Sequence, residues 1–367
     1  MAGTFLSVSN IRPGNIISED VYVNTKFPII NRNTEITTEH IEVLHSFGIK
    51  EVRVGNSFVA EDETLKVSGI GSADVEEIVK KTQAGIDEIK SQYKNAVTNY
   101  KKEFISWRAG TRPDIAKVRE IIIPLLKSFN KQNSMLTLLN DLSDSKAYLY
   151  HHSIAVGILA SAISEEMGYK VGQTMQIGLA GVLADCGMAK IDPSITGKAA
   201  FLTKAEFNEV KKHTIYSYKM LKDTPLLLKE MKLAIFQHHE RLDGSGYPRG
   251  DKLQDVSTIS QILAVADVFH AMTSERIYRE KESPFKVIEM IMEEEFGKFD
   301  INVVLALHKL VGNLSIGTKV RLTNGEDGEV IFIHRDAKLR PMIKMNIDNS
   351  IMNLTKNRHL AVERVLP

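Results

Sequence analysis

Residues 238–248 decide how the middle of this chain is interpreted, and they run His238-His239-Glu240-Arg241-Leu242-Asp243-Gly244-Ser245-Gly246-Tyr247-Pro248. The mainly apolar residues 231–237 before them predict a helix, whereas the Gly and Pro residues predict a loop. Neutral imidazole is the commonest metal ligand in proteins. Neighbouring helical residues point about 100° apart, so both imidazoles reach one ion only if it lies near the end or edge of the helix. A His pair alone is more typical of ordinary surface or core histidines, so a metal site needs further ligands.

The bulk composition is that of a globular protein of two or three domains. The chain has 367 residues, of which 43% are hydrophobic and 25% are charged. Its net charge of +1 gives no steering toward nucleic acid, so we expect no DNA partner. The single Cys186 excludes an internal disulfide and fits a reducing compartment. No signal peptide follows Met1, and the longest apolar stretches are too short to cross a bilayer. We therefore expect no membrane span and a cytoplasmic location.

The patterns along the chain predict a mainly α protein with four parts. These are a small α+β module (1–60), a linker and long amphipathic helix (61–110), a helical domain (111–312) and a small β-rich module (313–367). The β-rich module is indicated by two alternating segments on either side of an Asn324-Gly325 hairpin turn.

Apolar residues recur at helical spacing over residues 73–107, opposite a face of Glu, Lys and Gln. One interpretation is a helix that packs on its own chain. The other is a coil that joins two copies in a homodimer or passes a signal. The spacing is too loose for strict heptads, and the pattern leaves both interpretations open.

Two carboxylates stand where apolar residues are expected in the helical domain. Asp185 follows the apolar residues 177–183, and Asp267 lies inside the apolar residues 262–269. A buried carboxylate must be paired, hydrogen-bonded or bound to a metal. Each carboxylate alone is better explained as a helix cap or an ion-paired core residue than as a metal ligand. Together with four histidines on other predicted helices they favour a metal site of the kind that helical bundles build from facing helices. The six are His152, Asp185, His213, His238, His239 and Asp267.

In order and spacing these segments resemble the HD-GYP domain, a branch of the HD phosphohydrolase superfamily. The resemblance covers roughly residues 145–311 and is carried by His152-Ser153, residues 183–187, Lys212-His213, residues 238–248 and residues 264–279. It implies an HD-GYP-type helical bundle. It also implies hydrolysis of cyclic di-GMP, a bacterial second messenger, at a centre of two divalent metals.

The resemblance also implies a role for each site residue. Asp185 would bridge the two metals as the catalytic carboxylate, His213, His238 and His239 would complete one site, and His152 and Asp267 would serve the other. The ligand would be bound by Gly246, Tyr247, Pro248, Arg276 and Arg279. Mixed His and carboxylate ligands favour Fe or Mn, with Zn as an alternative. Two metals can clamp a phosphodiester and activate water for in-line attack.

Three positions depart from the family pattern. Ala184 stands in place of the His of the His-Asp doublet, so the His152/Asp267 site loses one ligand. Met188 stands where a Lys is frequent, and Tyr148 stands where an acidic residue can bring in a third metal. We therefore expect a dinuclear centre with one weakened site.

The departures leave two main hypotheses. The first is a phosphodiesterase, weakened by Ala184, that opens cyclic di-GMP to linear pGpG or to GMP. The second is a catalytically impaired receptor or scaffold that binds the nucleotide, or a protein partner, through the Gly246-Tyr247-Pro248 loop. A weaker third interpretation is a purely structural cluster of paired His and Asp, which stoichiometric metal would exclude.

Overall fold

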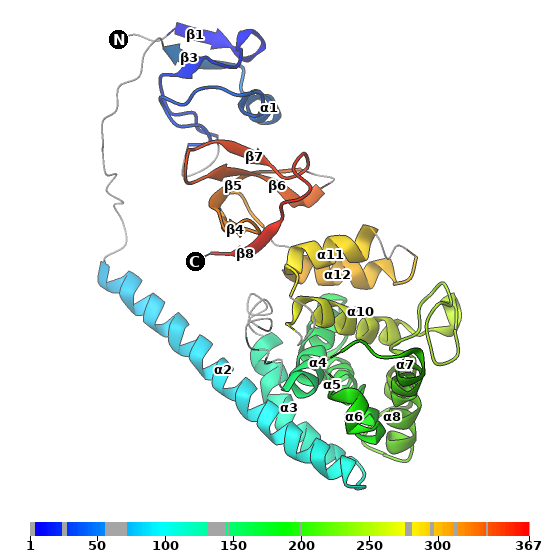
Figure 1. Ribbon diagram of the computed structural model, residues 1–367. Helices are drawn as coiled ribbons and strands as arrows, with labels where there is room; N and C mark the ends of the chain where they lie inside the picture. Colours follow the sequence, from blue (N-terminus) through cyan, green and yellow to red (C-terminus); the bar gives the residue numbers. More distant parts are fainter. Residues whose placement is uncertain are drawn as a thin grey trace. The chain divides into compact units, whose positions relative to one another are not determined.

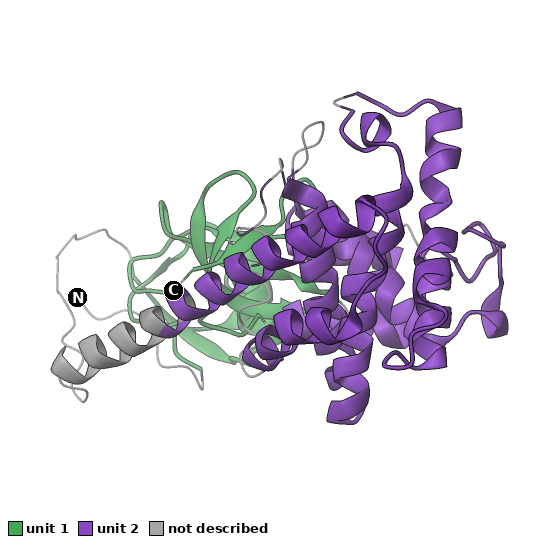
Figure 2. Cartoon of the chain, turned by 90° about the horizontal axis from the view of Figure 1, so that it is seen from below, with its two compact units in different colours: residues 1–70, 314–367 green, residues 71–313 purple. Residues whose placement is uncertain are grey.

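The protein is helical in its middle and carries antiparallel strands near both ends (Figure 1). This confirms the predicted mainly α class with small α+β and β-rich flanks. The computed structural model describes residues 4–23, 28–55, 72–130, 139, 142, 144, 147–198, 200–275, 281–293, 297–311, 314–334 and 337–366. The chain divides into two compact units, residues 71–313 and the combination of residues 1–70 with 314–367 (Figure 2).

The helical unit is built from eleven α-helices and two short 3-10 helices among its described residues. In chain order they are α2 (Ser72–Arg108), α3 (Ile115–Asn130), α4 (Tyr148–Glu166), α5 (Val171–Leu183), η4 (Cys186–Lys190), α6 (Pro193–Thr196), α7 (Lys204–Lys211), α8 (His213–Leu221), α9 (Lys229–Gln237), η5 (Leu253–Asp255), α10 (Thr258–Thr273), α11 (Pro284–Glu293) and α12 (Ile301–Val311).

The small residues within 154–160 predict a helix that its neighbours approach closely, and glycines do let α4 and α5 pack backbone to backbone. A Cβ on Gly157 of α4 would collide with Val182 and with the carbonyl oxygen of Gly178 on α5. A Cβ on Gly181 would in turn lie 2.9 Å from the Cα of Gly157. Only glycine, which has no side chain, permits this approach. The contact fixes the end of α5, where Asp185 follows, beside the α4 turn that carries His152.

The second half of α2 packs on its own chain. Its apolar face is buried from Ile89 to Trp107, and Tyr100 donates a 2.8 Å hydrogen bond to the carbonyl of Val182. The interpretation that α2 packs on its own chain is thus confirmed for this half. The homodimer through residues 73–107 stays a prediction, and the side chains of the first half lie mostly outside the described ones.

The capping-box pattern from Thr203 to Glu206 predicts one helix that carries His213, and the structure divides this helix. Thr203 caps α7 in a capping box with Glu206, as its sequence indicates. However, α7 ends at Lys211 and His213 opens a separate helix, α8. The sequence also predicts a polar linker at 61–72 and a core helix at 135–142. Apart from Ser72, the linker lies outside the described residues, as does most of that helix.

The two ends of the chain form one unit rather than two separate modules. Its elements are β1 (Thr4–Ser7), η1 (Val8–Asn10), β2 (Ile16–Ile17), α1 (Thr38–Ser46), β3 (Glu51–Gly55), β4 (Lys319–Leu322), β5 (Asp327–His334), β6 (Ala337–Met345), β7 (Ile351–Asn353) and β8 (Val362–Val365). The antiparallel strands lie in the orders β1-β3-β2 and β7-β6-β5-β4-β8. Ile331, Met342 and Ile351 from the C-terminal sheet share one hydrophobic core with N-terminal residues such as Val43 and Leu44.

Among the described helices, none combines the length and the apolar character needed to cross a bilayer.

Candidate metal centre

Asp185 lies at the junction of α5 and η4, where the chain is held by contacts with α8. The hydroxyl of Ser217 on α8 accepts a 2.8 Å hydrogen bond from the N–H of Gly187 and donates one of 2.7 Å to the carbonyl of Ala184. A Cβ on Gly187 would collide with the carbonyl oxygen of His213. This close fit places the first residue of α8, His213, next to Asp185.

His238 and His239 follow the last turn of α9 and lead into the Gly-Tyr-Pro loop. Glu240, which is completely buried, holds that loop. Its carboxylate accepts hydrogen bonds of 2.7, 3.2 and 3.1 Å from the backbone N–H groups of Arg249, Gly250 and Asp251. The loop therefore returns over the end of α9, where the two imidazoles are.

Four of these side chains converge on one point. Asp185, His213, His238 and His239 each offer a ligand atom, and these atoms lie within 4.8 Å of one another. The Nε2 atoms of His213 and His238 are 3.2 and 3.5 Å from Oδ1 of Asp185.

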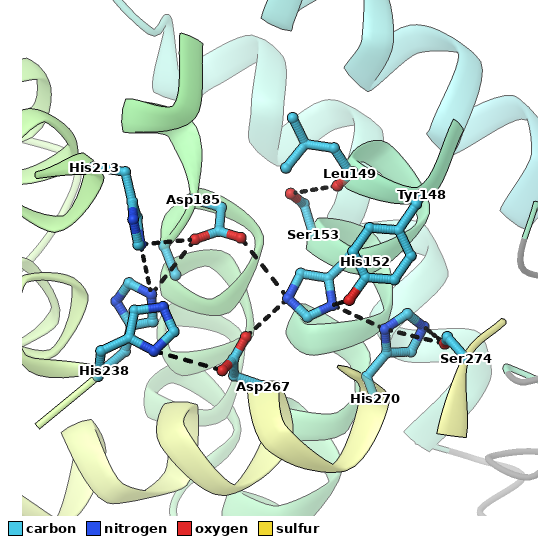
Figure 3. Close-up of polar contacts among 12 residues, drawn as sticks. Tyr148, Leu149, His152, Ser153, Asp185, His213, His238, Asp267, His270 and Ser274 are labelled. Carbon is cyan, nitrogen blue, oxygen red and sulfur yellow. Dashed lines mark hydrogen bonds and ion pairs between the residues drawn. The ribbon is translucent and has the colours of Figure 1, made fainter. Parts of the chain in front are cut away.

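The other carboxylate oxygen of Asp185 faces a second pair of residues (Figure 3). Nε2 of His152 on α4 is 3.7 Å from Oδ2 of Asp185 and 2.8 Å from Oδ1 of Asp267 on α10. Nδ1 of His239 is 3.7 Å from Oδ2 of Asp267. His239 therefore links the group of His213 and His238 to the pair of His152 and Asp267. Asp185 thus lies between two groups of ligands, with one oxygen toward each.

The lone pairs of the candidate ligand atoms are arranged to bind a cation. The Nδ1 atoms of His213 and His238 lie 2.6 and 2.7 Å from the carbonyl oxygens of Val210 and Ile235, so each Nδ1–H donates to a carbonyl three residues earlier in the chain. In the neutral rings this leaves the Nε2 lone pairs facing each other across 3.4 Å and facing Oδ1 of Asp185. Oδ1 is buried and accepts no hydrogen bond from the described residues. A metal ion between these electron-rich atoms would satisfy all three, and imidazoles held by backbone carbonyls are typical of metal ligands.

Charge at the centre favours ionised carboxylates beside imidazoles. Burial would raise the pKa of Asp185, but His213 and His238 hold it well below its usual value. Burial and the neighbouring His238 keep the pKa of His239 well below 6.5, so its ring is neutral. Burial would lower the pKa of His213, but the Asp185 carboxylate raises it. A cation at this ring therefore competes with a proton.

Comparison with known proteins assigns this arrangement to a family. Residues 137–303 match the HD domain family. A cyclic di-GMP phosphodiesterase of Pseudomonas aeruginosa is 32% identical over 238 residues, which are 65% of this chain and 57% of that protein. One of Thermotoga maritima is 30% identical over 284 residues, 71% of this chain and 76% of that protein. One of Borreliella burgdorferi is 24% identical over 354 residues, 96% of this chain and 90% of that protein.

The chain belongs to the HD-GYP branch of the HD domain family. This confirms the family that the motifs of the sequence indicate. The chain spans only 57% of the length of the Pseudomonas relative.

The six residues that the sequence singles out as HD-GYP metal ligands form one cluster in the structure, with Asp185 between the other five. The Gly-Tyr-Pro loop also lies at the centre, because the Tyr247 ring is 4.7 Å from that of His239 and its N–H donates to the His239 carbonyl. A Cβ on Gly246 would collide with backbone atoms of His239 and Arg241, so this turn requires glycine. Pro248 follows in the same loop. Arg276 and Arg279 lie outside the described residues.

Ala184 is buried, with 3% of its surface exposed, and its methyl group offers no ligand atom beside Asp185. Sequence reasoning missed two buried polar residues of this HD-GYP centre, Glu240 and His270. Glu240 directly follows the His pair, and His270 stands one helical turn after Asp267 inside an apolar helix. The signal available in the sequence for both was an ionisable residue close to a predicted ligand, since such residues are seldom buried without a partner.

Proposed function

We propose that this chain is a metal-dependent phosphodiesterase that hydrolyses cyclic di-GMP to linear pGpG or to GMP. The observation that carries the proposal is the position of Asp185, with one carboxylate oxygen toward His213 and His238 and the other toward His152. The names of the relatives support the substrate, since those described above are cyclic di-GMP phosphodiesterases.

In this proposal the described side chains divide the work between two cations. Asp185, His213, His238 and His239 would hold one, and Asp185, His152 and Asp267 would hold the other. Divalent ions bound there would polarise the phosphodiester and activate water, and the imidazole and carboxylate donors favour Fe or Mn over Zn.

The loop of Gly246, Tyr247 and Pro248 would hold the nucleotide against His239. Arg276 and Arg279 would bind its phosphates with their guanidinium forks.

The buried methyl of Ala184 favours a second candidate function, an impaired enzyme that serves as a receptor for the nucleotide or as a scaffold for a protein partner at the Gly-Tyr-Pro loop. A weakened second metal site would lower turnover while the first site still binds phosphate. The cytoplasmic location and the homodimer through residues 73–107 stay predictions.

Incubation with cyclic di-GMP separates the two functions. The full chain is loaded with Mn²⁺ or Fe²⁺, and the linear dinucleotide and GMP are followed by chromatography. We expect product above a metal-free control and above an Asp185→Asn variant. Absence of product above the metal-free control would end the enzymatic proposal. Nucleotide binding by calorimetry in that case would favour the receptor, and absence of binding would exclude the ligand form of that function as well.

A further inference from the structure

A row of buried polar side chains extends behind the metal ligand His152, on the side away from Asp185 (Figure 3). Nδ1 of His152 is 2.9 Å from Nδ1 of His270, and Nε2 of His270 is 3.0 Å from the hydroxyl of Ser274. The hydroxyl of Tyr148 is 3.1 Å from the same Nδ1 of His152. His270 and Ser274 are at most 1% exposed. The end of the row formed by His270 and Ser274 is therefore buried, whereas Tyr148 is half-buried.

The hydrogen between the two imidazoles can lie on Nδ1 of His152 or on Nδ1 of His270. When Nε2 of His152 bears the hydrogen, it donates to Oδ1 of Asp267 at 2.8 Å, and Nδ1 must accept from its neighbour. When Nε2 binds a cation, the hydrogen must lie on Nδ1, and the neighbour must accept it. An imidazole does both, because one of its nitrogens donates while the other accepts. The Ser274 hydroxyl rotates to match either state of His270.

His270 is better placed than Tyr148 to be this partner. It lies one helical turn after Asp267 on α10, so a single helix contacts both nitrogens of the His152 ring. Its own second nitrogen is fixed by Ser274. The Tyr148 ring instead stacks on His152 with the planes 22° apart, which is a packing contact in its own right.

We propose that His270 is a positioning residue, which accepts the Nδ1–H of His152 and thereby fixes the tautomer and ring orientation with which His152 binds the second metal ion. The inference rests on the metal centre proposed above. Loss of an outer partner of this kind typically lowers metal affinity about 10–100-fold.

Three variants of the full chain test the role. His270→Asn keeps an acceptor, because Oδ1 of Asn takes the place of Nδ1 of His. His270→Leu removes it, and Tyr148→Phe removes the tyrosine hydroxyl while leaving the ring. Binding is followed by Mn²⁺ titration, which gives the number of ions and the affinity of the weaker one, and by the visible absorption of the Co²⁺-loaded protein, which reports ligand geometry. Circular dichroism checks that each variant is folded.

We expect His270→Leu to weaken the second ion about 10–100-fold and leave the first unchanged, while His270→Asn and Tyr148→Phe bind both ions as the natural chain does. The proposal is overturned if His270→Leu binds the second ion normally, if His270→Asn is as weak as His270→Leu, or if Tyr148→Phe shows the loss instead. A natural chain that binds no ion would overturn the metal centre itself, which is a different result from any of these three.

Discussion

The two sides of Asp185 hold their imidazoles in different ways. On one side, His213 and His238 each donate Nδ1–H to a carbonyl three residues earlier in the chain. On the other side, Nδ1 of His152 contacts two side chains. One is Tyr148 on the same helix, α4, and the other is His270 on α10. A carbonyl oxygen only accepts, so the first side is prearranged with its Nε2 atoms free for a cation. The second side depends on partners that change roles, and Ala184 adds no ligand there. We infer that the first side binds its ion more tightly.

The largest effect is expected from Asp185→Asn, which should weaken metal binding on both sides and so remove the difference in affinity between them. An amide has no charge and cannot share two anionic oxygens between two ions, so the affinity for each ion should fall more than about 100-fold. Elemental analysis after dialysis measures the ions retained per chain.

The exposed Asp223, paired at 3.6 Å with Arg112, gives the matched control Asp223→Asn, which should retain the metal. Retention of both ions by Asp185→Asn would mean that the carboxylate is not shared.

The variant Ala184→His should reduce the difference in metal affinity between the two sides. It offers an imidazole beside Asp185, so the weaker ion should bind about 10–100-fold more tightly, with little change in the tighter one. Mn²⁺ titration measures both affinities. Since position 184 is buried, Ala184→Leu is the control for added volume. Equal behaviour of the His and Leu variants would refute the idea that a missing ligand weakens this side.

A smaller effect is expected from Ser217→Ala, which tests the backbone support of the first side. Its hydroxyl pairs with Gly187 N–H and the Ala184 carbonyl, and removal leaves both buried groups unpaired. The free energy of unfolding should fall by about 1–3 kcal/mol, and the tighter ion should weaken. Urea unfolding and the same titration measure these changes.

Ser106→Ala on the exposed surface of α2 is the control for this loss, and it should change stability by less than about 0.5 kcal/mol. Equal stability of the two variants would show that the Ser217 bridge adds nothing.

Acid is expected to destabilise the unit of the two chain ends, which holds none of the candidate metal ligands. In α1, Nδ1 of His40 accepts a 3.0 Å hydrogen bond from the N–H of Thr37, and burial lowers the pKa of His40 from 6.5 to about 4. Above pH 6.5 the ring is neutral in both the folded and the unfolded chain. Between pH 6.5 and 4 the unfolded chain binds the proton first, so this unit should lose about 2–3 kcal/mol of stability.

Urea unfolding at several pH values measures the loss. His40→Asn, which keeps the acceptor without titrating, should remove most of it. An unchanged pH dependence in His40→Asn would assign the loss to other groups.

The ligand set could be predicted from the sequence because its members stand out locally. Asp185 follows an apolar helix, Asp267 interrupts another, and two adjacent histidines precede a Gly-rich turn. Such signals survive without knowledge of tertiary contacts. The close packing of α4 on α5 was also predictable, since Gly157 lies in a run of small residues.

The partners behind the ligands could not be predicted in the same way. Whether His270 meets His152 depends on the rotamers of two rings that lie 118 positions apart in the chain. The division between α7 and α8 at Lys212 left no break in the helical pattern. The common core of the two chain ends joins Leu44 to Met342, and an apolar pattern reveals that a face is buried but not what covers it.

That common core has a consequence for synthesis on the ribosome. Val43 and Leu44 emerge early, but Ile331, Met342 and Ile351, which cover them, are translated only after the whole helical unit. At about 5–20 residues per second this delay lasts tens of seconds, during which the nascent N-terminal segment has an unfinished apolar surface. We therefore expect the helical unit to fold first, while chaperones shield the early segment until its C-terminal strands are made.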